Sequence, residues 1–200
     1  KNIFHRFNSK IFSIYSMEFN CKLTVLGMMS GTSMDGLDCI IAKIQINNEY
    51  KLEFQIIEEK TFRISSKLRN EISEIVDNPR INYLSLHEKL GLFYSSSVSQ
   101  LINKQKLDLI AFHGQTIFHQ EKVKSIQIGN PFPISNLFNI PILYNFREAD
   151  IKAGGTGAPL MPFLDWLLFK NSKFNDITLN IGGISNITYI PKNGKKNTVI

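Results

Sequence analysis

A glycine-rich loop with two carboxylates carries the most distinctive chemistry in the sequence. Residues 30–38 read SGTSMDGLD, so small and hydroxyl residues stand around two glycines. Glycine lets the backbone approach a ligand closely, and successive N–H groups in such a turn form an anion-binding concavity. Asp35 and Asp38 are suited to hold a hydrated magnesium ion, a normal companion of nucleotide phosphates. The loop lacks the lysine of a Walker loop, and a plain hairpin turn is the alternative reading.

A histidine and two further polar residues follow a predicted buried strand over residues 107–112. They form the segment His113-Gly114-Gln115-Thr116. Strand ends are where α/β sheets present ligands, so this segment is a candidate for binding a sugar hydroxyl or a phosphate. A packed histidine in a turn is the alternative. His119 has no Cys, Asp or Glu that would complete a metal site, and it is predicted to be a structural or rim residue.

Arg147 follows another predicted strand, over residues 141–146. An arginine at a strand end can hold a phosphate or sugar oxygen with two parallel donors. A surface ion pair with Glu148 or Asp150 is the alternative. The turn that follows contains three glycines, which permit a sharp change of direction before a predicted helix over residues 161–169: Gly154, Gly155 and Gly157.

A hairpin is predicted near the end of the chain. Strands over residues 177–181 and 187–190 flank a loop that contains Gly182, Gly183 and Asn186. A plain hairpin turn and a second ligand-binding loop both fit these residues. Strand, small-residue loop and strand also follow one another over residues 23–44, and two such hairpins suggest a duplicated architecture.

The remaining pattern predicts a layered α/β domain. Apolar and β-branched runs predict strands over residues 23–28 and 37–46, and a weak alternation over residues 52–64 is consistent with a third. Three strands joined by short loops suggest an antiparallel opening sheet. Helices are predicted from the Ser65-Ser66 cap to about Asp77 and over residues 84–102, where apolar residues recur near helical spacing. Strands alternating with helices after this opening indicate the α/β class.

Charge and composition argue against several kinds of partner. The formal charge is +6, but basic residues without acidic ones occupy residues 1–16 and 191–200, and the rest of the chain carries equal numbers of both. The overall charge therefore gives little support to the hypothesis of a nucleic-acid partner. No apolar run reaches the roughly 18 residues of a membrane span. The two cysteines form no CxxC pair or ligand cluster, which indicates a reducing compartment.

Together the four segments resemble the anhydro-N-acetylmuramic acid kinase family. Residues 30–38 are similar to its SGTSxDGxD signature, and residues 113–116 to its HGQT segment. Residues 145–160 resemble its DFRxxDxAxGGQGAPL block, and residues 180–186 its NIGGxxN segment. Four collinear matches make chance a poor explanation. Two departures occur: Asn145 replaces the usual Asp and loses its charge, and Thr156 replaces the usual Gln with a shorter side chain.

The resemblance implies sites for ATP, Mg²⁺ and a sugar. ATP phosphates would bind the first loop and the last hairpin, through Gly31, Thr32, Ser33, Met34, Asp35, Gly36, Leu37, Asp38, Gly182, Gly183 and Asn186. The magnesium ion would be held by Asp35 and Asp38. The sugar would be bound by His113, Gln115, Thr116, Arg147 and Gly155.

The implied fold is that of the actin and hexokinase-like ATPases. These are built from ribonuclease-H-like domains, each a mixed sheet with helices on both faces. Residues 1–16 are predicted to be a non-native or disordered extension. Residues 17–175 would form the first ribonuclease-H-like domain, and residues 176–200 would begin a second, truncated one.

The implied activity is an ATP-dependent sugar kinase reaction in the cytoplasm. Water opens the 1,6-anhydro ring and O6 is phosphorylated, giving N-acetylmuramic acid 6-phosphate for peptidoglycan recycling. The partners would be ATP and an anhydro amino sugar, with a homodimer of the full-length protein left open. The general base is expected beyond Ile200, in an FDTGPGN-like segment, so the 200-residue chain alone is expected to be inactive. A non-catalytic sugar- or phosphate-binding module and a degenerate relic are the alternatives.

Overall fold

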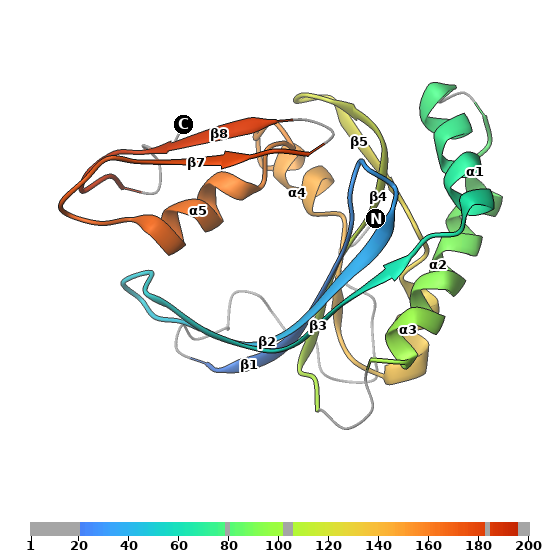
Figure 1. The fold of residues 1–200 in the computed structure, drawn as a ribbon, viewed down its shortest axis with the longest axis horizontal. Coiled ribbons are helices and arrows are strands. Elements are labelled where there is room, and N and C mark those ends of the chain that lie inside the picture. The colour runs from blue at the N-terminus through green and yellow to red at the C-terminus, as the bar shows by residue number, and fades with distance from the viewer. Residues whose placement is uncertain (1–20, 79–80, 102–105, 183–184, 196–200) are drawn as a thin grey trace.

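A computed structural model describes residues 21–78, 81–101, 106–182 and 185–195. Figure 1 shows the arrangement of its helices and strands. In chain order they are β1 (Leu23–Ser30), β2 (Gly36–Ile46), β3 (Leu52–Arg63), α1 (Ser66–Asp77), α2 (Leu84–Ser99), β4 (Leu109–Gln120), β5 (Lys124–Ile128), α3 (Phe132–Phe138), β6 (Ile142–Leu143), α4 (Phe146–Lys152), α5 (Met161–Phe169), β7 (Asp176–Asn180) and β8 (Asn186–Ile190).

Strands β1 to β6 form one mixed sheet of six strands in the order β3-β2-β1-β4-β5, with β6 beside β4. β1, β2 and β3 make the antiparallel meander that the sequence predicts, and β4 pairs with β1 in parallel. The outer edge of β4 is divided between two strands. β6 pairs with Ile110 and Ala111, whereas β5 pairs from Gln115 onward.

One face of this sheet forms the main core together with α1 and α2. Leu26 and Met28 of β1 stand opposite Ile41 and Cys39 of β2, and all four side chains are buried. Tyr94 of α2 belongs to the same cluster. Because side chains alternate along a strand, the residues between these point to the other face. Figure 1 shows α1, α2 and α3 together on the core side of the sheet.

Local sequence explains how the two core helices begin and pack. The Ser65 hydroxyl accepts a hydrogen bond from the Leu68 N–H at 3.3 Å, so it caps α1 as predicted. In α2, Gly91 lies against the chain between β5 and α3. A Cβ at this position would lie 2.5 Å from the Asn130 carbonyl oxygen, so glycine permits this close approach.

The opposite face of β1 to β3 is open within the described residues. Met29 and Ile40 are 47% and 37% exposed and line a hollow of about 530 Å³. In Figure 1, α5 lies on this side of the sheet. Its Trp166 and Leu167 pack with β8 and with the end of the β2–β3 hairpin, at Ile46, Tyr50 and Leu52. Of the helices expected on both faces, α1 and α2 cover one face, while α5 on the other packs at the end of the β2–β3 hairpin and leaves Phe163, Leu164 and Leu168 46%, 39% and 40% exposed.

Strands β7 and β8 form a separate antiparallel sheet of two strands, as the predicted hairpin requires. The Thr178 hydroxyl donates to the buried Asp165 carboxylate of α5 at 2.8 Å, and the Trp166 indole N–H donates to the Gly194 carbonyl at 2.9 Å. The hairpin and α5 therefore pack as one unit. Among the described residues, no helix combines the length and hydropathy needed to cross a bilayer.

Two predicted strand ends are wrong in ways that matter for the site. β4 does not stop before His113 but continues through it to Gln120, because β5 gives this second half a partner. The predicted strand over residues 141–146 shrinks to Ile142–Leu143, because β6 pairs only with the first half of β4. Arg147 therefore lies in the first turn of α4 rather than at a strand end. The pattern also missed β5, α3 and α4.

Candidate functional site

The loop between β1 and β2 is a tight turn with free backbone donors. Met34 adopts a left-handed conformation with φ of 53°, and its N–H donates to the Gly31 carbonyl at 3.1 Å. Thr32 and Ser33, at the tip of this turn, are exposed, and their backbone N–H groups have no partner among the described residues. Adjacent free N–H groups in a turn are suited to an anion, as the sequence predicts.

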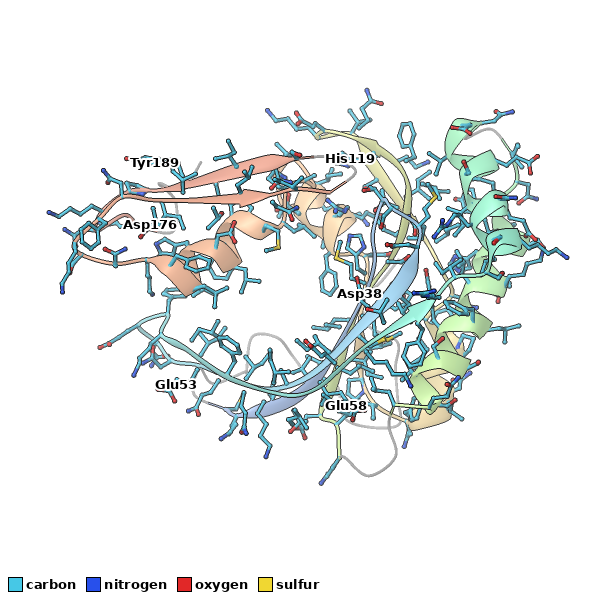
Figure 2. All side chains as sticks on the ribbon, in the orientation of Figure 1. Asp38, Glu53, Glu58, His119, Asp176 and Tyr189 are labelled. Atoms are coloured by element: carbon cyan, nitrogen blue, oxygen red, sulfur yellow. The ribbon has the colours of Figure 1, made fainter. Side chains whose placement is uncertain are left out.

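Asp35 of the loop and Asp38 of β2 accept hydrogen bonds from different hydroxyl groups. The Ser33 hydroxyl donates to Asp35 Oδ1 at 2.6 Å, and the Thr61 hydroxyl donates to Asp38 Oδ1 at 2.6 Å. The Ser33 bond is the main cause that lowers the pKa of Asp35, so this exposed carboxylate stays ionised near neutral pH. Asp38 lies on β2 (Figure 2) and is also exposed.

These donors fit a magnesium ion in kind, because Mg²⁺ prefers carboxylate oxygens and keeps several of its waters. A cluster of three or more His, Cys, Asp or Glu side chains that could hold a metal is absent from the described ranges. Any ion at Asp35 and Asp38 would therefore need further ligands from phosphate or water.

Gln115 joins this loop to β4 from the inside. Its side chain is 1% exposed, its Oε1 accepts from the Ser30 hydroxyl at 2.7 Å, and its Nε2 donates to the Gly31 carbonyl at 3.2 Å. A buried amide with both ends occupied has little capacity left for a ligand. In this structure the Gln115 amide therefore holds the loop, and its role as a sugar ligand stays a prediction. Thr116, next along β4, is half-buried and its hydroxyl accepts from Gln127.

His113 and Arg147 meet in a specific hydrogen bond. Arg147 Nε donates to His113 Nε2 at 3.0 Å, and His113 Nδ1 lies 2.8 Å from the Gly114 carbonyl. An arginine can only donate, so Nε2 must be the acceptor and Nδ1 must carry the proton. Burial lowers the pKa of His113, and the Arg147 charge lowers it further, although the Gly114 carbonyl opposes both. His113 is therefore neutral here.

The same arginine fixes the glycine-rich turn. Arg147 Nη1 donates to the Gly157 carbonyl at 2.9 Å, and the Gly157 N–H donates to the Asp150 carboxylate at 2.8 Å. A Cβ on Gly155 would collide with that carboxylate, and Gly157 has φ of +80°. Close packing against Asp150 therefore requires a glycine at position 155, which was predicted to bind sugar. Nη2 of Arg147 has no protein partner among the described residues and remains available to a ligand.

The two residues that depart from the family pattern also lie here. Asn145 precedes α4 in the left-handed region, with φ of 60°, a conformation that asparagine tolerates better than most residues. Its side chain makes no capping bond. The Thr156 hydroxyl donates to the Ala158 carbonyl at 2.7 Å, inside the turn. Both residues therefore serve backbone geometry in this chain.

A cavity of about 500 Å³ runs along β5, between the start of α2 and α4. Aromatic and polar side chains line it, including His87, Phe112, His113, Gln127, Asn145 and Glu148. Apolar rings beside convergent polar groups are typical of a site for a small polar ligand. His113 thus faces both the cavity and Arg147.

Two further residues lie at the edge of the site, of which only His119 was considered in the sequence, as a structural or rim residue. Arg69, in the first turn of α1, donates from Nε to the Met34 carbonyl at 2.9 Å. His119 (Figure 2) lies against Gly157, and both of its ring nitrogens are buried without a partner in the described part of the chain. A long-range contact between an arginine and a loop carbonyl leaves no pattern in the sequence, so spacing alone could not have found Arg69.

The predicted residues of the last hairpin are only partly placed. Gly182 is exposed beyond the end of β7, and Asn186 begins β8 opposite Asn180. Gly183 lies outside the described residues. Hydrogen bonds within the described chain join the first three segments to each other but do not reach Gly182 or Asn186.

Comparisons with known proteins identify the family of this chain. The family model for anhydro-N-acetylmuramic acid kinase matches residues 23–198. The anhydro-N-acetylmuramic acid kinase of Clostridioides difficile (strain 630) is 40% identical over 181 residues, which are 84% of this chain and 47% of that protein. The enzymes of the same name from Bacillus thuringiensis subsp. konkukian (strain 97-27) and Bacillus cereus (strain AH820) are each 35% identical over 190 residues, 88% of this chain and 50% of each relative.

The chain spans about half the length of the curated relatives it matches. Its match to the family model covers nearly all of the residues that the structure describes. On this similarity, the chain belongs to the anhydro-N-acetylmuramic acid kinase family.

Proposed function

We propose that this chain forms the phosphate-binding and sugar-binding part of an ATP-dependent kinase for 1,6-anhydro-N-acetylmuramic acid. The proposed reaction opens the anhydro ring with water and phosphorylates O6, in the cytoplasmic recycling of peptidoglycan. The observation that carries the proposal is the set of hydrogen bonds that joins three family segments. Gln115 connects the β1–β2 loop to β4, while His113 and Arg147 connect β4 to α4 and the glycine-rich turn.

In this proposal the phosphates of ATP bind at the exposed N–H groups of Thr32 and Ser33. Asp35 and Asp38 would hold Mg²⁺, which would supply positive charge to stabilise the transferring phosphoryl group. Fixed N–H donors add to that stabilisation, because they require no reorganisation during the reaction. Gly182, Gly183 and Asn186 are proposed to contribute from the last hairpin.

The sugar is proposed to bind at His113, Thr116 and Arg147. The free Nη2 of Arg147 suits a sugar oxygen, and the neutral His113 orients the guanidinium group through Nε. Burial lowers the pKa of Arg147, which reflects a partly desolvated site where such bonds are stronger. The cavity along β5 provides room beside His113.

We assign no general base among the described residues. Asp35 is bound to Ser33 in the phosphate loop, and Asp150 is bound to the Gly157 N–H. The water that opens the anhydro ring needs a carboxylate with free lone pairs near the sugar. The proposal therefore divides the functions: this chain binds and orients, and the base lies elsewhere in the complete enzyme.

We also propose the ribonuclease-H-like fold for residues 17–175 and a second such domain beginning at residue 176. The antiparallel β1 to β3 meander followed by a parallel β4 supports the first part. The separate β7–β8 sheet supports the second part, although α5 packs against it.

Calorimetric titration with 1,6-anhydro-N-acetylmuramic acid tests the sugar site, on chain shown to be folded by circular dichroism. Binding is expected, and Arg147→Ala should weaken it by about tenfold or more, because a hydrogen bond from a charged donor is lost. Arg63→Ala, an exposed arginine on β3, is the matched control and should bind like the wild type. Equal binding by both variants would remove Arg147 from the site. No binding by the folded wild type would contradict a preformed sugar site.

A further inference from the structure

Arg69 of α1 holds the β1–β2 loop from its outer side. Its Nε donates to the Met34 carbonyl at 2.9 Å. The next loop carbonyl, that of Asp35, accepts from the Ile64 N–H at 3.0 Å, at the junction between β3 and α1. Two consecutive carbonyls of the loop are thus fixed by donors from one neighbouring segment. Gln115 fixes Gly31 from the opposite side, so the loop is held between β4 and α1.

Met34 is the residue that most needs this support. Its φ of 53° lies in the left-handed region, which L-residues with a side chain adopt at an energetic cost. Such conformations persist when the surroundings determine them. With Met34 in this conformation its N–H turns inward to Gly31, while the N–H groups of Thr32 and Ser33 are left free.

The Arg69 guanidinium group also places positive charge beside the loop. Its Nη atoms have no hydrogen-bond partner in the part of the chain that the structure describes, and the residue is exposed. After the Ser33 hydroxyl and the backbone N–H of Asp35, its charge also contributes to the lowered pKa of Asp35. The same charge would favour an anion at the neighbouring N–H groups.

We propose that Arg69 is a positioning residue of the phosphate loop. Through the Met34 carbonyl, it keeps the Thr32 and Ser33 N–H groups in the orientation that binds phosphate oxygens. This inference rests on the proposed phosphate-binding function of the loop.

The test compares Arg69→Met, Arg69→Lys and the matched control Lys67→Met in the 200-residue chain. Lys67 is an exposed cation two residues away on α1 that makes no hydrogen bond to the described residues. Two quantities are measured by NMR: hydrogen exchange of the Met34 amide without ligand, and affinity for magnesium tripolyphosphate from the shifts of the loop amides. The first reports the loop alone and the second reports phosphate binding.

Arg69→Met is expected to speed exchange of the Met34 amide and to weaken tripolyphosphate binding, each by about tenfold, as for one lost hydrogen bond from a charged group. Arg69→Lys should restore part of both effects, and Lys67→Met should change neither. If Arg69→Met behaves like Lys67→Met in either measurement, the positioning role is wrong. If the wild-type chain binds no tripolyphosphate, the phosphate loop itself is wrong and this proposal falls with it, a result distinguishable from a change confined to Arg69.

Discussion

His113 and Arg147 show how one side chain can set the protonation of another. Arg147 requires an acceptor at Nε2, and only the neutral ring of His113 provides one. Protonation would place two cations in contact in a partly buried site. The folded protein therefore binds a proton at His113 more weakly than the unfolded chain does.

This pairing predicts a loss of stability in mild acid. The folded pKa of His113 is lowered from its ordinary value. Neutral His113 therefore contributes to the free energy of unfolding in full above about pH 6.5, and this contribution is lost as the pH falls through the folded pKa. His113→Gln keeps an acceptor that does not titrate, and its free energy of unfolding in urea should fall less between about pH 7 and about pH 5. The lowered pKa of His87 affects both proteins alike. Parallel pH dependences for the two proteins would contradict this account.

At the scale of elements, the site depends on how β4 is attached to its neighbours. β4 pairs with β1 in parallel, and the register shifts where Met28 and Ser30 meet the region of Gln115. At this irregularity, the Gln115 side chain adds hydrogen bonds to Ser30 and Gly31. The loop is therefore attached both to β1, which it follows, and to β4, through Gln115.

Replacing Gln115 with leucine should test this attachment. Gln115→Leu removes the partner of the Gly31 carbonyl and leaves the buried Ser30 hydroxyl with the Gly36 carbonyl alone, so a loss of about 1–3 kcal/mol in the free energy of unfolding is expected. Urea denaturation followed by circular dichroism measures it. Gln120→Leu, at the exposed end of the same strand, is the control and should stay within about 0.5 kcal/mol of wild type. Similar losses in both variants would show that the amide has no special role.

The elements that the sequence predicted are those with strong local signals. β1 and β2 have apolar runs, β3 alternates weakly, and α1 has both an apolar face and the Ser65 cap. α4 has seven residues, no side-chain cap and no buried residue, so its conformation depends on the bonds that Arg147 and Asp150 make to the following turn. Such contacts cannot be read from spacing.

The site residues divide in the same way. The motifs named His113 and Arg147, which the structure joins by a hydrogen bond, and their binding roles stay predictions. Motifs alone do not distinguish an exposed side chain from a buried one that supports the loop, and Gln115 is of the buried kind. That distinction depends on burial, and burial is set by strand pairing far along the chain. The assignments on the last hairpin remain predictions.

For the molecule as a whole, one exposed apolar surface lies on the β7–β8 hairpin. Leu179 and Ile187 are cross-strand neighbours that are 58% and 62% exposed, and Ile177 and Ile181 extend the same apolar surface. Contiguous apolar patches on a protein surface favour association. We therefore expect the 200-residue chain to associate with itself through this face.

Leu179→Lys should weaken that association by about tenfold, the equivalent of about 1.4 kcal/mol for one partly buried leucine. Sedimentation velocity over a range of concentrations measures the change. Leu92→Lys, on the exposed side of α2 with 63% exposure, removes a leucine of similar exposure outside the hairpin and should have little effect. If Leu92→Lys weakens association as much as Leu179→Lys does, the contact surface is not the hairpin.

The single tryptophan of the chain lies far from the main core. Trp166 packs between Tyr50, Lys170 and the β8 side of the hairpin, where the Lys170 ammonium lies 4.1 Å from the ring centroid and the indole donates to Gly194. Its fluorescence therefore observes the docking of α5 onto the hairpin and the β2–β3 turn, while far-ultraviolet circular dichroism observes the sheet and helices as a whole. Comparing Trp166 fluorescence with circular dichroism during denaturation shows whether α5 separates from the hairpin before the sheet unfolds.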